Sequence, residues 1–125
     1  MISWYSIDGN LSIVEQGAVI REDAMRIIED YSKRADATDE RGEGALAATM
    51  FGFQKSKAEF VEICFNSTDE ISFTYEHSVP RKFLFLSVPK ITRKEKTLRR
   101  VEDVKAAVFS FYEMDAHSFQ RLLDA

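Results

Sequence analysis

The stretch AEFVEICFNSTDEISFTYE, from Ala58 to Glu76, decides the fold class of this chain. Polar and apolar side chains alternate strictly along residues 70–76. In residues 61–65, Val61, Ile63 and Phe65 share one face, opposite Glu62 and Cys64. A period of two is typical of a strand with one buried and one wet face. The polar residues 66–69 form a turn between the two halves, so the stretch predicts an antiparallel hairpin.

The flanking sequence predicts further strands and three helices. Strands are expected at residues 2–7, 11–14, 47–55, 58–66, 70–76 and 82–88. Asp8-Gly9 is a favoured hairpin turn between the first two, and residues 82–88, apolar on both faces, predict a central or covered strand. Helices are expected at residues 21–34, 97–113 and 117–123, where apolar residues recur at helical spacing. Asp115 is expected to cap the last helix.

The connections then select the architecture. Residues 35–44 and 89–96 are expected to be loops because they are polar and, in the first case, rich in glycine. Links of hairpin length between the strands exclude a parallel doubly wound sheet. The prediction is therefore one α+β domain spanning residues 1–125, with an antiparallel β-sheet (a meander) and the helices packed on one face.

Composition supports a self-sufficient core. The chain has 125 residues, of which 45% are hydrophobic and ten are Phe, so neither a disulfide nor a metal is needed to hold it together. The single Cys cannot form an internal disulfide, which favours a reducing compartment. The first residues carry no basic region followed by a long apolar run. A cytoplasmic protein without a membrane partner is expected.

Charge is strongly segregated along the chain, although the net charge is only −4. Residues 1–79 carry 15 acids and 7 bases, residues 80–101 carry 8 bases and one acid, and residues 102–125 carry 5 acids and 2 bases. Such asymmetry bears on the choice of partner rather than on the fold.

Motifs for catalysis and cofactors are missing from the sequence. No glycine-rich phosphate-binding motif occurs. His77 and His117 have no neighbouring ligand at metal-binding spacing, and the neighbours of Cys64 are acids, which disfavour a thiolate. Glu59 and Glu62 are expected on opposite faces of one strand. We therefore predict no catalytic, cofactor-binding or metal-binding residue, while an enzyme site assembled in space from Cys64, the two histidines and the acids remains an alternative.

The basic stretch from Arg81 to Arg100 raises nucleic-acid binding as a second alternative. The aromatic residues that would stack on bases, Phe83 and Phe85, lie in the strand expected to be buried. The rest of the chain is net acidic and would repel nucleic acid. A solvated segment whose charges meet acids elsewhere is the preferred interpretation.

The acidic residues of the expected loop and of the wet strand face could form one negative surface. Acidic surfaces often serve solubility alone, but they also suit a basic partner because complementary charge speeds association and fixes its register. From the residues alone the two interpretations have equal weight.

A family resemblance adds to these patterns. The helix at residues 21–34, the strands within MFGFQKSKAEFVEICFNSTDEISFTYE and the helix entered by RRVEDVKAAVFSFYE, Arg99 to Glu113, resemble the bacterial immunity proteins paired with secreted deaminase and nuclease toxins. Val101-Glu102-Asp103-Val104 matches the entry to the terminal helix of that family. The resemblance covers about two thirds of the chain and is a pattern of elements.

The resemblance implies a non-catalytic inhibitor that binds one cognate toxin domain and occludes its active site. The toxin is expected to be basic, and the inhibitor a monomer in a heterodimeric complex. A small acidic secretion chaperone, which would be a homodimer, is the competing interpretation. Partner contacts are expected from the acids of the negative surface, with Tyr75 as an aromatic anchor: Asp36, Asp39, Glu40, Glu43, Glu62, Glu70 and Glu76.

Overall fold

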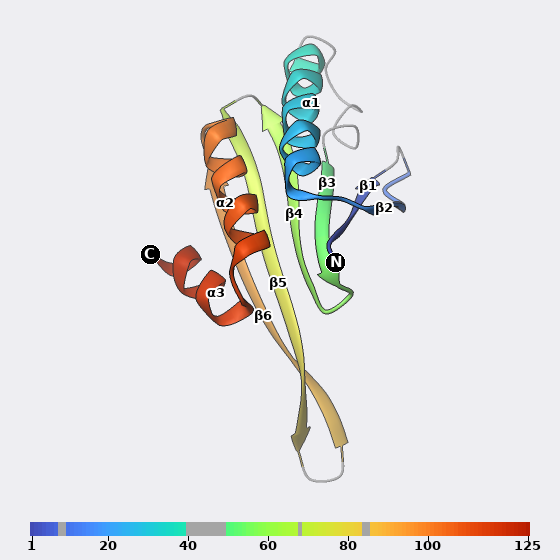
Figure 1. The fold of residues 1–125 in the computed structure, drawn as a ribbon, viewed down its shortest axis with the longest axis vertical. Helices are drawn as coiled ribbons and strands as arrows, with labels where there is room; N and C mark the ends of the chain where they lie inside the picture. The colour runs from blue at the N-terminus through green and yellow to red at the C-terminus, as the bar shows by residue number, and fades with distance from the viewer. Residues whose placement is uncertain (8–9, 40–49, 68, 84–85) are drawn as a thin grey trace.

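The computed structural model describes residues 1–7, 10–39, 50–67, 69–83 and 86–125, except for the side chains of 36–39, 81–83 and 86–87. These residues form six strands and three helices (Figure 1). In chain order they are β1 (Ser3–Ile7), β2 (Ile13–Ala18), α1 (Arg21–Asp39), β3 (Met50–Ser56), β4 (Glu59–Ser67), β5 (Glu70–Phe83), β6 (Leu86–Leu98), α2 (Val101–Glu113) and α3 (Ala116–Asp124).

All strand pairs in the sheet are antiparallel, in the order β2-β1-β3-β4-β5-β6. The three helices lie on one face of this sheet (Figure 1). The α+β class, the antiparallel sheet and the one-sided packing of helices are as predicted. The predicted hairpin is β4–β5, in which Phe65 pairs with Ile71 and Val61 with Tyr75.

The core lies between the sheet and the helices. Phe51 of β3 is fully buried and stacks on Tyr31 of α1, with ring centroids 4.1 Å apart. Tyr75 of β5 packs against Phe119 of α3 at 5.0 Å. The amphipathic spacing of the helices explains their position, because the apolar stripe of each one faces this layer. Its buried helical residues are Ala24, Ile28, Tyr31, Ala35, Val104, Val108, Phe111, Phe119 and Leu123.

Helix boundaries follow local signals with two corrections. Asp115 caps α3 as predicted, since its side chain accepts a hydrogen bond from the Ser118 backbone N–H at 2.8 Å. The second helix begins at Val101 rather than near Thr97, because Thr97 and Leu98 still pair with β5. The first helix continues to Asp39, so residues 35–39 are helical and not part of a loop.

The segment after residue 80 differs most from the prediction. Residues 89–96, predicted to be a loop, belong to β6. Of residues 82–88, predicted to be a covered central strand, 82–83 end β5 and 86–88 begin β6, and the other two lie outside the described residues. Strand β4 stops pairing with β5 at His77, and the hairpin continues beyond it as a two-stranded arm (Figure 1). Each of residues 89–96 pairs with a residue of β5. Strand β6 is an edge strand of the sheet, where charged side chains are tolerated, so its polar sequence resembles that of a loop.

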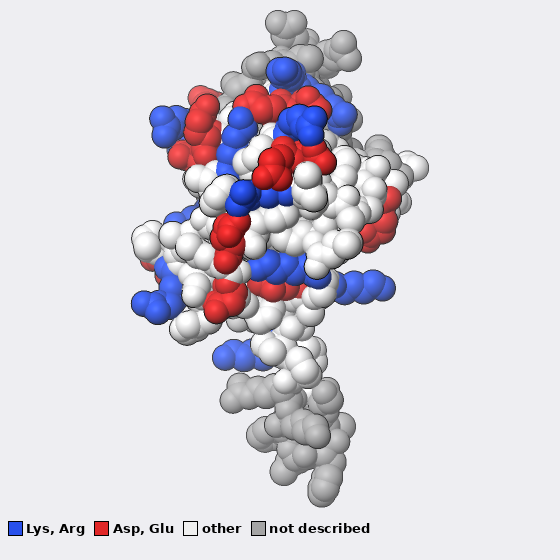
Figure 2. Space-filling model, in the orientation of Figure 1, with Lys and Arg blue, Asp and Glu red and all other residues white. Residues whose placement is uncertain are grey.

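Charge on the helical side is mixed. Figure 2 shows acidic and basic side chains interspersed over α1 and α2. Pairs join the elements there: Arg21 of α1 contacts Glu113 of α2, and Lys105 of α2 contacts Glu29 of α1. The helical side is therefore not a surface of a single sign.

Candidate functional site

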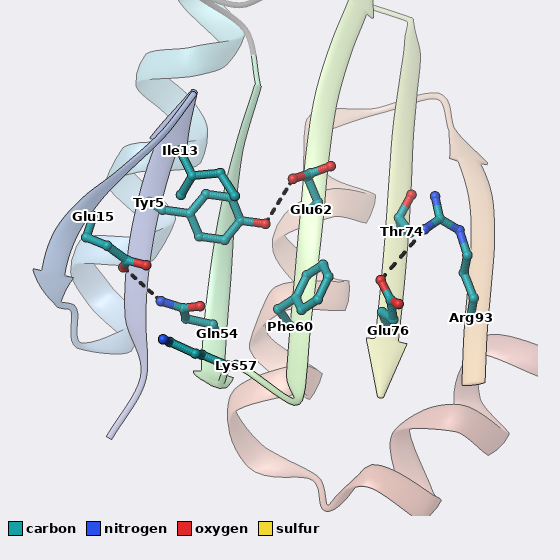
Figure 3. A pocket seen from close by; sticks show the side chains of 10 residues that line it. All are labelled: Tyr5, Ile13, Glu15, Gln54, Lys57, Phe60, Glu62, Thr74, Glu76 and Arg93. Atoms are coloured by element: carbon teal, nitrogen blue, oxygen red, sulfur yellow. Dashed lines mark hydrogen bonds and ion pairs between the residues drawn. The ribbon is translucent and has the colours of Figure 1, made fainter. Parts of the chain in front are cut away.

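The other face of the sheet carries no helix and is crossed by two rows of side chains. Strand alternation places these residues opposite the core. The first row runs through Tyr5, Gly52, Glu62, Thr74 and Glu95, and the second through Ser3, Gln54, Phe60, Glu76 and Arg93. A groove of about 450 Å³ lies along these rows (Figure 3). Its lining is Tyr5, Ile13, Glu15, Gln54, Lys57, Phe60, Glu62, Thr74, Glu76 and Arg93.

Tyr5 and Gly52 build one wall of the groove together. A Cβ atom on Gly52 would lie 2.2–2.6 Å from atoms of the Tyr5 ring, so only glycine lets the ring lie across β3. The ring is 3% exposed, and its hydroxyl donates a hydrogen bond to Glu62 Oε1 at 3.0 Å. The missing side chain at position 52 thus allows Tyr5 to orient Glu62 (Figure 3).

Three carboxylates line the groove against two cationic side chains. Glu15 accepts a hydrogen bond from Gln54 Nε2 at 2.8 Å. Glu76 faces Arg93 at 3.7 Å, which is beyond hydrogen-bond distance. Arg93 makes its shorter contact with Glu95, from Nε at 2.8 Å. The ion pair between Glu76 and Arg93 is therefore a loose one.

The electrostatic field of the groove is negative at the Tyr5 hydroxyl. Burial first, and then the charge of Glu62 with its hydrogen bond and the charges of Glu15 and Glu76, raise the pKa of Tyr5 well above its ordinary value of 10.0. Burial disfavours any charge at the hydroxyl itself, whereas the three carboxylates would attract a cation in the open part of the groove. Phe60 adds an aromatic side chain among these charges, which is a surface on which a cation can rest.

The structure brings Glu62 and Glu76 together and separates the other acids predicted to contact a partner. Glu70 is exposed at the start of β5, on the same face but outside the groove. Asp36 and Asp39 lie in the last turns of α1, and their side chains are outside the description. Glu40 and Glu43 lie outside the described residues.

Tyr75, predicted to be an aromatic anchor, lies on the buried face of β5. Its side chain is fully buried, and its hydroxyl donates to Glu59 at 2.8 Å on the helical side. An anchor must reach the surface of the free protein, so Tyr75 is withdrawn from the contact set. The same bond confirms that Glu59 and Glu62 lie on opposite faces of β4.

Several groove residues were absent from the sequence prediction. Tyr5, Glu15, Phe60 and Arg93 come from four different strands, and only the register brings them together. One local signal was present: Gly52 interrupts a strand between two phenylalanines, and a strand glycine often marks a close approach of another group.

The residues of the alternative enzyme site do not converge. Cys64 pairs with Ser72 on the uncovered face, where its Sγ lies 3.4 Å from Asn66 Oδ1. His77 lies on the helical face, with Nδ1 3.4 Å from Gln120 Nε2, and His117 is exposed on α3. The residues that the structure describes contain no group of three His, Cys, Asp or Glu able to hold a metal ion.

Alternation along β6 divides its basic side chains between the two faces of the sheet. Lys94 pairs with Asp124 at 2.9 Å on the helical side, whereas Arg93 lies on the uncovered face beside Glu76 and Glu95. By the same alternation Lys90 and Lys96 share the side of Lys94, so Arg93 is the basic residue of this strand that reaches the groove.

Comparison with family models, with curated proteins and with solved structures finds no match to this chain. Within the described ranges, no helix combines the length and the apolar character needed to cross a membrane.

Proposed function

We propose that the chain is a non-catalytic immunity protein, which binds a cognate toxin domain with the uncovered face of its sheet. The observation that carries the proposal is the groove on that face, where half-buried carboxylates surround an aromatic side chain. Aromatic residues and partly desolvated charges are typical anchors of protein interfaces. The resemblance of residues 99–113 and the strand pattern to immunity proteins supports the same function.

The negative charge of the groove indicates which kind of toxin surface it would bind. A toxin that acts on nucleic acid needs a basic surface around its active site. Glu62 and Glu76 on an uncovered face would complement that surface. The inhibitor would then cover the entrance to the toxin's active site and exclude its substrate. The helices would face away from the toxin and hold the sheet rigid.

The test is coexpression in bacteria with the toxin domain encoded beside this chain. Unaltered protein should restore growth, and the double charge reversal Glu62→Lys with Glu76→Lys should abolish the rescue. With purified proteins, that variant should bind at least about 30-fold more weakly, the lower bound for a charge pair buried in an interface.

Glu70→Lys is the control for position, because it reverses one glutamate on the same face outside the groove; it is compared with Glu62→Lys and with Glu76→Lys singly as well as with the double variant. It should rescue growth fully. Thermal unfolding of all variants must show that they remain folded. Full rescue by the folded double variant would refute binding through this face, and a homodimer by light scattering would favour the secretion chaperone instead.

A further inference from the structure

The centre of the groove is a ring between two carboxylates. Phe60 lies directly opposite Glu76 in the β4–β5 register, and Glu62 lies two residues from Phe60 on the same strand face. Directly opposed side chains have Cβ atoms about 5 Å apart, and diagonal neighbours about 7–8 Å. A planar cation lying over Phe60 would therefore reach both carboxylates.

The two carboxylates differ in their hydrogen bonding and ion pairing, and both can accept hydrogen bonds from a bound cation. Tyr5 uses one oxygen of Glu62 and fixes its direction, while an ionised carboxylate retains further acceptor sites. Glu76 is 25% exposed and has Arg93 at 3.7 Å. A carboxylate that is partly removed from water and only loosely paired gains more from a close cation than an exposed one does.

We propose that this groove receives an arginine side chain of the partner, which stacks on Phe60 and replaces Arg93 beside Glu76; the inference rests on the proposed function for the origin of that arginine. Arg93 is 56% exposed and keeps its 2.8 Å contact with Glu95, so it can leave Glu76 without losing its own partner. Arg93 is thus a built-in competitor for the site.

Arginine fits this geometry better than lysine. Its guanidinium group is planar, presents donors in a fixed fork and stacks on aromatic rings. The ammonium group of lysine is compact and strongly hydrated, and it cannot lie flat on Phe60 while donating to two carboxylates. The groove should therefore discriminate between two residues of equal charge.

The experiment needs no toxin. The full chain, labelled with ¹⁵N, is titrated with arginine blocked at both ends as the acetyl and methylamide derivative, and then with blocked lysine and blocked citrulline. Citrulline has nearly the shape of arginine without its charge. Arginine should shift the signals of the groove residues and saturate, lysine should bind about threefold more weakly, and citrulline should cause no saturable shift.

Variants give effects of opposite sign. Arg93→Gln removes the competitor and should tighten arginine binding about threefold, whereas Glu76→Gln should weaken it about threefold. Lys57→Gln is the control for net charge: Lys57 lines the same groove, and its removal should change affinity by less than about twofold. Phe60→Leu should reduce the preference for arginine over lysine.

Weaker arginine binding by Arg93→Gln, or equal tightening by Arg93→Gln and Lys57→Gln, would overturn the competitor role. Saturable binding of citrulline, or shifts confined to residues outside the groove, would overturn the arginine site itself. The two proposals fail separately. Arginine binding without any growth rescue would refute only the immunity function, and toxin binding without arginine binding would refute only this inference.

Discussion

The two faces of the sheet are built from alternate residues of the same strands, yet they have different structures. The helical face is a closed layer of rings, such as Phe51 on Tyr31 at 4.1 Å. The uncovered face is a set of polar contacts around a groove, such as Tyr5 with Glu62 at 3.0 Å. The helical face holds most of the stabilising packing, and our proposal assigns recognition to the other face, so the two should respond separately to mutation.

The largest effect on stability is expected on the helical face. Phe51→Ala removes a fully buried ring that contacts Tyr31, Phe53 and Phe65. It should lower the free energy of unfolding by about 3–5 kcal/mol, measured by denaturant unfolding. Phe60→Ala, on the uncovered face, should lower it by about 1 kcal/mol. Equal losses would contradict the division between the faces.

A smaller loss is expected where the uncovered face has its own close packing. Gly52→Ala places a Cβ against the Tyr5 ring and should lower the free energy of unfolding by about 1–3 kcal/mol. In a Tyr5→Ala background the same change should lower it by much less, because the ring is gone. If the two changes are additive in chemical unfolding, the contact is not the reason for the glycine.

Alkaline pH probes both faces through the tyrosines. Burial, as the leading cause, raises the pKa of all four: Tyr5, Tyr31, Tyr75 and Tyr112, the last to about 12. In the unfolded chain they ionise near 10.0, so above that pH the native state holds more protons than the unfolded state does. The contribution of the tyrosines to stability should be constant well below pH 10 and be lost progressively as the pH rises above it.

The ultraviolet absorbance of tyrosinate, followed against pH beside a structural signal, checks this expectation. Ionisation should coincide with unfolding rather than precede it. Tyr5→Phe should reduce the alkaline loss, since it removes the one phenol on the uncovered face. A phenolate titrating near pH 10 in a folded chain would show that its ring is more accessible than the structure has it.

The smallest effect is expected for Glu70→Lys. The residue is exposed on the uncovered face outside the groove, so the free energy of unfolding should change by less than about 0.5 kcal/mol. Partner binding should also be unchanged, as measured by calorimetry. A large loss of binding would mean that the contact surface extends beyond the groove toward the start of β5.

Much of the fold was predictable because local patterns decide it. The alternation in residues 61–65 and 70–76 determines which side chains face the core. It places Tyr75 among them, so the prediction of Tyr75 as a surface anchor conflicts with the strand pattern. Asp115 was recognisable as a cap from its position before an apolar stripe. These features depend on neighbours in sequence.

The groove and the arm were not predictable for a physical reason. Residues 91–96 alternate between the faces, but almost every one of them is polar, so hydrophobic periodicity gave no signal for an edge strand. The apolar pattern of residues 82–88 predicts a covered strand, but hydrophobicity alone does not show which strands a segment pairs with. The groove takes side chains from all six strands, β1 to β6, through registers that no local pattern fixes.

One measurement tests most directly whether the uncovered face binds the partner. Side-chain NMR signals of the labelled chain are compared with and without the purified toxin domain. Phe60, Gln54 and Ile13 report on the groove, and Phe109 and Leu122, both exposed on helices, report on the other side. We expect the first three signals to shift and the last two to remain. Shifts at Phe109 and Leu122 with unchanged groove signals would contradict binding through the sheet face.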